Sequence, residues 1–283
     1  MNSQAGSLIF FLLLALLSHA FSQSQLRRSR VRSLLATMEE SSKEVTTSSK
    51  IPNLDDTIEL GHLSAMVYGF RRKHAAQNCS AFPAIYQNYM NEFQPSVFIH
   101  SNATFTCHMY ERDEQDTQVL LLSKEFGEEQ QGQGYIAVIY AGTDDFRTML
   151  TDTDILMKTF GTTGDNGTHP LVPPGRDDIK THAGFNNAVF KRGLFDRIKH
   201  HVHEIKEDHP NYRLLTTGHS LGAADAVLTA VALKLQEDWK DELVLSINYG
   251  CPKTGNRAWR EYVNEMDGLG IWRVVNGLDL AAR

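Results

Sequence analysis

The stretch from Tyr212 to Leu235 constrains the fold of this chain more than any other. It reads YRLLTTGHSLGAADAVLTAVALKL, which predicts a buried strand, a sharp turn and a long apolar helix. Ser220 lies at the corner, and Gly218 and Gly222 flank it in a G-x-S-x-G pattern. Glycine at both positions lets strand and helix pack closely and holds a serine in a strained turn with its hydroxyl exposed. The stretch therefore predicts a nucleophile at the end of a strand; the alternative is an ordinary strand-to-helix turn without chemistry.

The residues on both sides of this corner alternate between expected strands and expected helices. Strands are expected at 97–99, 119–122, 135–140, 243–249 and 271–275, and helices at about 54–70, 182–208 and 255–266. Strands that alternate with helices predict a mostly parallel α/β sheet, with reactive groups in loops at the carboxyl ends of the strands. Ser220 and Asp279 both lie at such ends.

The segment after the strand at 135–140 has two open interpretations. Its aspartates and threonines are interspersed with apolar side chains, namely Phe146, Met149, Leu150, Ile155, Leu156, Met157 and Phe160. This amphipathic pattern fits an ordinary helix docked on the sheet, and it also fits a lid whose apolar face meets lipid. The Gly- and Pro-rich stretch that follows, 161–178, is expected to be a loop.

Composition and charge exclude several classes of protein. With 283 residues, 41% of them hydrophobic, the chain can bury one sizeable core. The net charge of −6 offers no basic surplus for nucleic acid, so no nucleic-acid partner is expected. Of the three histidines expected on one helix, only His200 and His203 share a face, so a metal site would need ligands from elsewhere. We expect neither a metal nor a cofactor.

The first 22 residues contain no Lys, Arg, Asp or Glu, and residues 8–17 form an unbroken apolar run. The run leads to small residues up to Ser22 and is shorter than the roughly 20 residues that a bilayer requires. We interpret 1–22 as a cleaved secretory signal peptide, with a membrane anchor as the alternative. The protein is then expected outside the cell, with no transmembrane segment after cleavage.

Residues 23–50 differ in composition from the rest of the chain. They are rich in Ser, Thr and charge, which predicts a flexible linker. The alternative is a propeptide that is cut near the dibasic Arg27-Arg28. From Ile51 the composition becomes globular, and 51–283 is expected to form the main domain.

Sequons and cysteines agree with export. Three N-x-S/T sequons lie in polar or turn-rich surroundings suited to a surface glycan, at Asn78, Asn102 and Asn166. In an oxidising compartment the simplest pairing of the three cysteines joins Cys79 to Cys107. Cys251 would then be a buried free thiol, unless its partner lies on chain outside this sequence.

The chemistry of a serine nucleophile requires two further groups. A histidine must take the hydroxyl proton, and a carboxylate must hold that histidine in the right tautomer. Asp279 is the candidate acid; the alternative is an aspartate that caps a turn after a strand. His219 neighbours Ser220 and points differently, so we do not expect it to act as the base.

Four motifs occur in order between Ala141 and Asp279: AGTDDFRTMLTD, HAGF, GHSLGAA, and YGCPKTGN followed by RVVNGLD. Together they resemble the fungal-type, or class 3, lipases of the α/β-hydrolase fold. The resemblance implies a mostly parallel sheet with helices on both faces. It implies Ser220 as the nucleophile and Asp279 as the triad acid. It also implies an oxyanion hole formed by the backbone N–H groups of Thr143 and Leu221.

The chain departs from this family's pattern at several positions. Ala141 stands where the family often has Arg, and Met149 stands where the family's lid often has Trp. Phe146 and Leu150 are further candidates for lid residues. The family's catalytic histidine lies some tens of residues after the acid, and no histidine follows the acid here. We therefore expect the base, and the part that closes the domain, on chain beyond Arg283.

By this resemblance the chain is a secreted serine ester hydrolase, similar to triacylglycerol lipases, that forms an acyl-enzyme and passes the acyl group to water. One alternative is an inactive homologue that binds lipid or a partner. Another is an esterase that acts on phospholipid, galactolipid or feruloyl esters. The expected partner is a lipid or other ester substrate at a lipid–water interface. Acyl length, interfacial activation and oligomeric state stay open.

Overall fold

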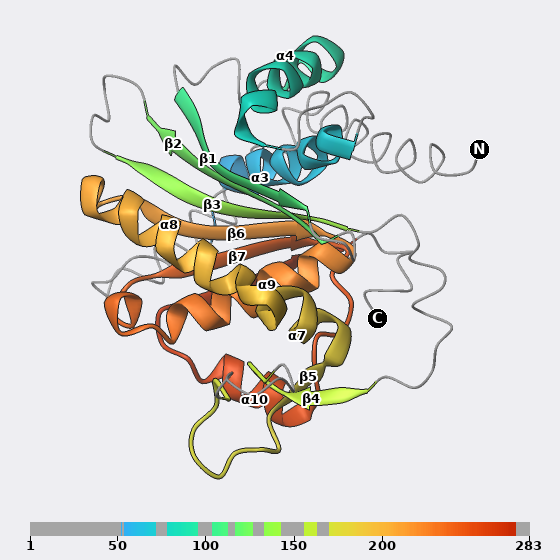
Figure 1. The fold of residues 1–283 in the computed structure, drawn as a ribbon, viewed down its shortest axis with the longest axis vertical. Helices are drawn as coiled ribbons and strands as arrows, with labels where there is room; N and C mark the ends of the chain where they lie inside the picture. The colour runs from blue at the N-terminus through green and yellow to red at the C-terminus, as the bar shows by residue number, and fades with distance from the viewer. Residues whose placement is uncertain are drawn as a thin grey trace, which may run out of the picture. The chain divides into compact units, whose positions relative to one another are not determined.

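A mixed sheet of six strands organises the part of the chain that the structure describes (Figure 1). This computed structural model describes residues 52, 54–71, 78–95, 104–112, 117–126, 133–142, 156–162 and 170–275. The strands are β1 (Thr104–Arg112), β2 (Gln118–Glu125), β3 (Gly134–Ala141), β6 (Arg213–His219), β7 (Val244–Tyr249) and β8 (Leu269–Val274), in the order β1-β2-β3-β6-β7-β8. β1 to β3 pair antiparallel, and β3, β6, β7 and β8 are parallel. The expected strand at 97–99 lies outside the described residues.

The helices form layers on the two faces of the sheet (Figure 1). They are α3 (Leu54–Met66), α4 (Phe82–Phe93), α7 (Ala183–Phe190), α8 (Leu194–Asp208), α9 (Leu221–Lys234) and α10 (Arg257–Asn264), with short 3-10 turns η1 (Val67–Arg71), η2 (Cys79–Ala81), η4 (Lys191–Gly193) and η5 (Glu237–Trp239). Neighbouring residues of a strand point to opposite faces. Thr217 of β6 bonds Ser64 of α3 at 2.9 Å, while Thr216 donates to the carbonyl of Ala226 in α9 at 2.9 Å. α3 and α9 therefore cover opposite faces.

The helix that follows the central corner is buried along its whole length. Every residue of α9 from Leu221 to Lys234 is buried, which goes beyond the one broad apolar face that the sequence predicts. It lies against β3, β6 and β7 on one side and α7 on the other. Burial on both sides holds α9 in place. Because α9 begins at Leu221, directly after Ser220, this also fixes the position of the serine. The strand 135–140 is likewise confirmed, because every residue of β3 is buried.

The prediction of one long helix at 182–208 is wrong. The structure has two helices, α7 and α8, separated by η4, where Arg192 has φ 67° and Gly193 has φ 68°. Two consecutive left-handed residues cannot continue a right-handed helix. Apolar side chains occur at helical spacing on both sides of the break, which conceals it in the sequence, and glycine at 193 is the local signal for it.

The helical interpretation of the segment after β3 fails where that segment is described. Met157–Thr159 forms a short strand, β4, that pairs antiparallel with β5 (Lys180–His182). Phe160 is fully buried, whereas the side chain of Leu156 is 72% exposed. Short apolar runs do not separate strand from helix, and pairing with a distant strand decides the outcome here. The lid candidates Phe146, Met149 and Leu150 lie outside the described residues.

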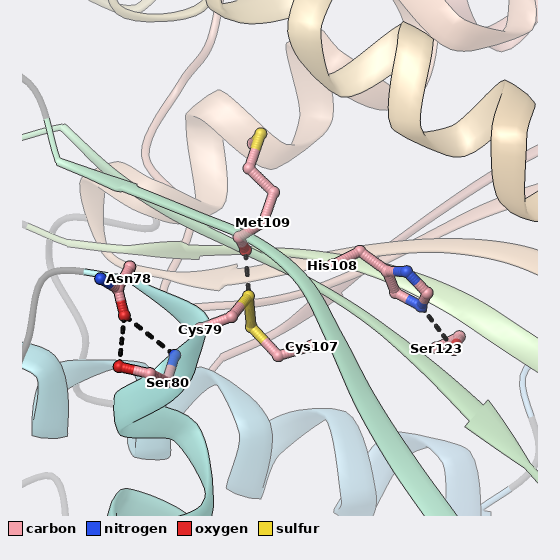
Figure 2. Close-up of a disulfide and its surroundings, with 7 residues drawn as sticks. All are labelled: Asn78, Cys79, Ser80, Cys107, His108, Met109 and Ser123. Carbon is pink, nitrogen blue, oxygen red and sulfur yellow. Dashed lines mark hydrogen bonds between the residues drawn. A yellow bond between two sulfur atoms is a disulfide. The ribbon is translucent and has the colours of Figure 1, made fainter.

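The predicted disulfide is present. Cys79, in η2, is bonded to Cys107, in β1, with a Cα–Cα distance of 5.5 Å (Figure 2). It ties the start of α4 to the first strand of the sheet. Cys251 is a buried free thiol, as expected, and its burial raises the pKa of that thiol to about 12.

Candidate active site

Ser220 occupies a strained backbone position between β6 and α9. Its φ is 57° and its ψ −124°, a region that costs a residue with a Cβ of the order of 1–3 kcal/mol. Two backbone hydrogen bonds hold it there: its N–H donates to the carbonyl of Tyr249 at 2.9 Å, and its carbonyl accepts from Ala223 at 3.1 Å. The turn thus places Ser220 between the last residue of β6 and the first residue of α9.

The two glycines of the G-x-S-x-G pattern are required by close backbone contacts. A Cβ on Gly218 would lie 2.4 Å from the carbonyl oxygen of Gly222, and a Cβ on Gly222 would lie 2.6 Å from the carbonyl carbon of Ala141. Neither position has room for any side chain. Because Ala141 ends β3, the second contact also brings the end of that strand against the corner.

A third glycine extends this contact toward the expected oxyanion hole. A Cβ on Gly142 would lie 2.5 Å from the carbonyl oxygen of His219 and 3.1 Å from Cβ of Ser220. The backbone that leaves β3 therefore passes directly beside the serine. Thr143, the next residue, lies outside the described part of the chain.

Tyr68, in η1, connects the two backbone segments that meet at Ser220. Its hydroxyl accepts a hydrogen bond from the N–H of Gly142 at 2.9 Å and lies 3.1 Å from Nδ1 of His219. Sequence reasoning missed this residue. It lies in an apolar run with Val67 and Phe70, and no spacing or motif distinguishes it from its neighbours.

Leu221 begins α9, so its N–H is one of the first-turn donors that have no acceptor within the helix. The positive end of the helix dipole lies at the same place and favours negative charge. Within the described residues, the hydroxyl of Ser220 forms no hydrogen bond. The corner thus presents a serine hydroxyl beside a backbone donor.

Three described histidines, His62, His182 and His219, each have a hydrogen-bond partner other than Ser220. His219 is engaged with Tyr68. His62 is buried and bonds the hydroxyl of Tyr89 at 2.9 Å, and burial lowers its pKa to about 4. His182 accepts from the N–H of Gly184 at 3.1 Å and caps α7, and burial lowers its pKa too. They have structural partners of their own.

The histidines of α8 lie close to exposed carboxylates. Glu204 lies 3.4 Å from His200 and 3.1 Å from His201, and Glu207 lies 3.5 Å from His203. Among the described residues, no group of three or more metal-ligating side chains is arranged to hold an ion.

Parallel strands bring the carboxyl end of β8 to the same edge of the sheet as Ser220. In register, His219 pairs with Tyr249, and Tyr249 pairs with Val274. The carbonyl of Val274 accepts from Gly250 at 2.9 Å. Asp279 follows Val274 by five residues in the sequence and lies outside the described part.

Residues 137–283 match the family model described as lipase (class 3). The match covers more than half of the chain and includes the corner at Ser220. The chain belongs to the class 3 lipase family. Members of this family are serine ester hydrolases, and the residues matched run from the middle of β3 past the end of β8.

Curated relatives of this class 3 lipase match over part of their length. A secreted mono- and diacylglycerol lipase of Malassezia restricta is 35% identical over 113 residues, which are 40% of this chain and 36% of that protein. A phospholipase A1 of Arabidopsis thaliana is 34% identical over 99 residues, 35% of this chain and 24% of that protein. The chain therefore spans about a third or less of the length of these relatives.

Solved lipase structures have the same fold. Lipase II from Rhizopus niveus superimposes with a TM-score of 0.56 at 20% identity, covering 82% of this chain and 75% of that one. A lipase from Rhizopus microsporus var. chinensis gives a TM-score of 0.55 at 21% identity, with 84% and 72% covered. The predicted α/β-hydrolase fold is confirmed.

Proposed function

We propose that this class 3 lipase is secreted and hydrolyses acylglycerol-type esters, with Ser220 as its nucleophile. The observation that carries the proposal is the strained conformation of Ser220, φ 57° and ψ −124°, between two glycines that have no room for a Cβ. A serine without a chemical role gains nothing from a left-handed backbone, since glycine would adopt it without strain.

The proposed reaction combines Ser220 with the groups that the class 3 lipase pattern implies. Oγ of Ser220 attacks the ester carbonyl while a histidine base accepts its proton, and Asp279 orients that base. The N–H groups of Thr143 and Leu221 stabilise the tetrahedral oxyanion, each by about 3 to 4 kcal/mol. The leaving alcohol takes the proton from the base. Water then repeats the attack on the acyl-serine and releases the fatty acid, which restores the serine.

The base is not assigned to a described histidine. His62, His182 and His219 have other hydrogen-bond partners. The histidines of α8 are on a solvent-facing surface and close to carboxylates. The base therefore stays outside the described residues in this proposal.

Three observations support secretion. The disulfide between Cys79 and Cys107 is favoured in an oxidising compartment. Residues 1–22 lack charge and contain an apolar run. The Malassezia relative is a secreted lipase by name. In the described parts of the chain, no helix is long and apolar enough to cross a membrane.

Substrate class is tested by a panel of esters. We expect release of fatty acid from mono-, di- and triacylglycerol emulsions, and loss of that activity in Ser220→Ala. The match to a plant phospholipase A1 makes phosphatidylcholine the second candidate substrate. If kcat/KM is higher for phosphatidylcholine than for the acylglycerols, phospholipid replaces acylglycerol as the proposed substrate. Absence of hydrolysis on every ester, by a folded protein, would instead identify a binding homologue.

A further inference from the structure

The sequon at Asn78 shares its middle residue with the disulfide. Asn78-Cys79-Ser80 is an N-x-S sequon, and its central Cys79 is bonded to Cys107 in β1 (Figure 2). Asn78 and Ser80 are both exposed. One tripeptide is thus the target of two different covalent reactions of the secretory pathway.

The hydrogen bonds of Asn78 leave its amide nitrogen available. Oδ1 of Asn78 accepts from the N–H of Ser80 at 2.9 Å and from its hydroxyl at 2.6 Å, which caps η2. In Figure 2 the amide nitrogen points away from Ser80, and within the described residues it donates no hydrogen bond. A sugar on that nitrogen therefore leaves the cap intact.

We propose that Asn78 is N-glycosylated and that closure of the Cys79–Cys107 disulfide limits its modification. The inference rests on the export step of the proposed function. In the transfer, Nδ2 of Asn78 forms a bond to C1 of an oligosaccharide, the bond from C1 to a lipid diphosphate breaks, and the amide proton leaves to a base of the transferase. In the competing reaction, the thiols of Cys79 and Cys107 form a disulfide and pass two electrons and two protons to the disulfide of an oxidoreductase, which becomes a dithiol.

The folded arrangement closes the sequon to a transferase. The hydroxyl of Ser80 is already engaged by Asn78, and Cys79 is fixed to β1. Directly after the sequon, Phe82 and Ile85 of α4 are buried. A transferase must take the tripeptide into its own cleft, and here its middle residue is bonded to β1 and its last residue leads into α4.

Synthesis gives the sequon a limited interval before it closes. Cys107 follows Cys79 by 28 residues, which takes roughly 1 to 6 s at 5–20 residues per second. In the folded protein β1 also pairs with β2, as in the bond of 2.7 Å between His108 and Ser123 (Figure 2). Until Cys107 has been synthesised, Cys79 cannot be bonded to it and the sequon is not fixed to β1. The fraction of Asn78 that is glycosylated therefore depends on the relative rates of glycan transfer and of disulfide formation.

Peptide mass spectrometry of the full-length protein, expressed in a eukaryotic secretory host, measures occupancy at Asn78. Protein from the endoplasmic reticulum and from the medium is combined, so that occupancy can also be measured for a variant that is retained inside the cell. We expect partial occupancy in the wild type and at least a twofold rise in Cys107→Ser, which preserves the sequon. Cys251→Ala, which changes a cysteine outside the disulfide, should leave occupancy unchanged, and Ser80→Ala should abolish it.

Two results would overturn the proposal. An unmodified Asn78 in both the wild type and Cys107→Ser would exclude the site, and equal occupancy in the two would exclude the competition. A chain that stays in the cytosol would overturn export, and with it this inference. That failure is distinguished from the other two by where the protein is found.

Discussion

Glycines around Ser220 keep its backbone in the left-handed region, because the neighbouring segments meet where no side chain fits. A Cβ added to Gly142, Gly218 or Gly222 would lie only 2.4 to 2.6 Å from a backbone atom of another segment. The strain at Ser220 is therefore maintained by three chain segments: the end of β3, the end of β6 and the start of α9.

Gly222→Ala tests this steric account. The added Cβ would lie 2.6 Å from the backbone of Ala141, so the end of β3 must shift, and we expect a loss of about 1 to 3 kcal/mol in unfolding free energy. Urea unfolding measures it. Gly175→Ala is the control, since no atom of the described residues lies within 4 Å of its Cβ and only its φ of 80° opposes the change. A larger loss at Gly175 than at Gly222 would contradict the account.

Tyr68→Phe tests whether Tyr68 positions the two segments beside the serine. Phe cannot accept the hydrogen bond from Gly142 or bond His219, and losing one such bond corresponds to about 1.4 kcal/mol, or a tenfold fall in kcat. We expect KM for a soluble short-chain ester to change little. Tyr262→Phe, in α10, is the control. A stability loss with kcat unchanged would limit Tyr68 to a structural role.

At the scale of elements, sequence patterns locate the strands and helices that are continuous and miss those that depend on distant contacts. β3, β7 and α9 are mostly apolar in sequence and buried along their whole length, which makes them recognisable. β4 and β5 have three residues each and exist because they pair with one another. No local preference specifies such a pair.

Loss of the disulfide tests how η2 and α4 are attached to β1. The separation of 28 residues between the two cysteines corresponds to a stabilisation of about 3 to 4 kcal/mol through the unfolded chain. We expect a reductant to lower the unfolding free energy of the wild type by that amount. It should have no effect on Cys79→Ser/Cys107→Ser. Equal sensitivity of both proteins to reductant would mean that the stabilisation lies elsewhere.

At the scale of the whole molecule, buried polar clusters hold the helix α3 to the sheet. The carboxylate of Glu59 bonds Lys124 of β2 at 2.7 Å and also bonds the hydroxyl of Tyr135 in β3. Asp56 forms a two-pronged ion pair with Arg213 of β6. The sequence shows these only as charges scattered over separate segments. Their pairing needs the three-dimensional arrangement, as does the contact of Tyr68 with the corner.

The stability of the molecule should fall in mild acid because of His62. Burial lowers its pKa to about 4 in the folded state, below about 6.5 in the unfolded chain. Between these values the unfolded chain binds more protons, so stability rises with pH across that window and is lost as pH falls through it. The full effect is about 3 kcal/mol.

Urea unfolding at pH 7 and pH 4.5 measures this difference. The fall should be smaller in His62→Gln than in the wild type, once each is compared with its own stability at pH 7. His200→Gln, on the exposed side of α8, should behave as the wild type does. An identical fall in all three proteins would assign acid sensitivity to other groups.

If Ser220 is the nucleophile, it should be the residue that a covalent serine-hydrolase inhibitor modifies in the full-length protein. The protein is treated with a fluorophosphonate, digested, and the modified residue located by tandem mass spectrometry. We expect one label, on Ser220, in parallel with loss of ester hydrolysis, and no label in Ser220→Ala. Hydrolysis that persists with Ser220 unlabelled, or a label on another residue that abolishes activity, would contradict this assignment.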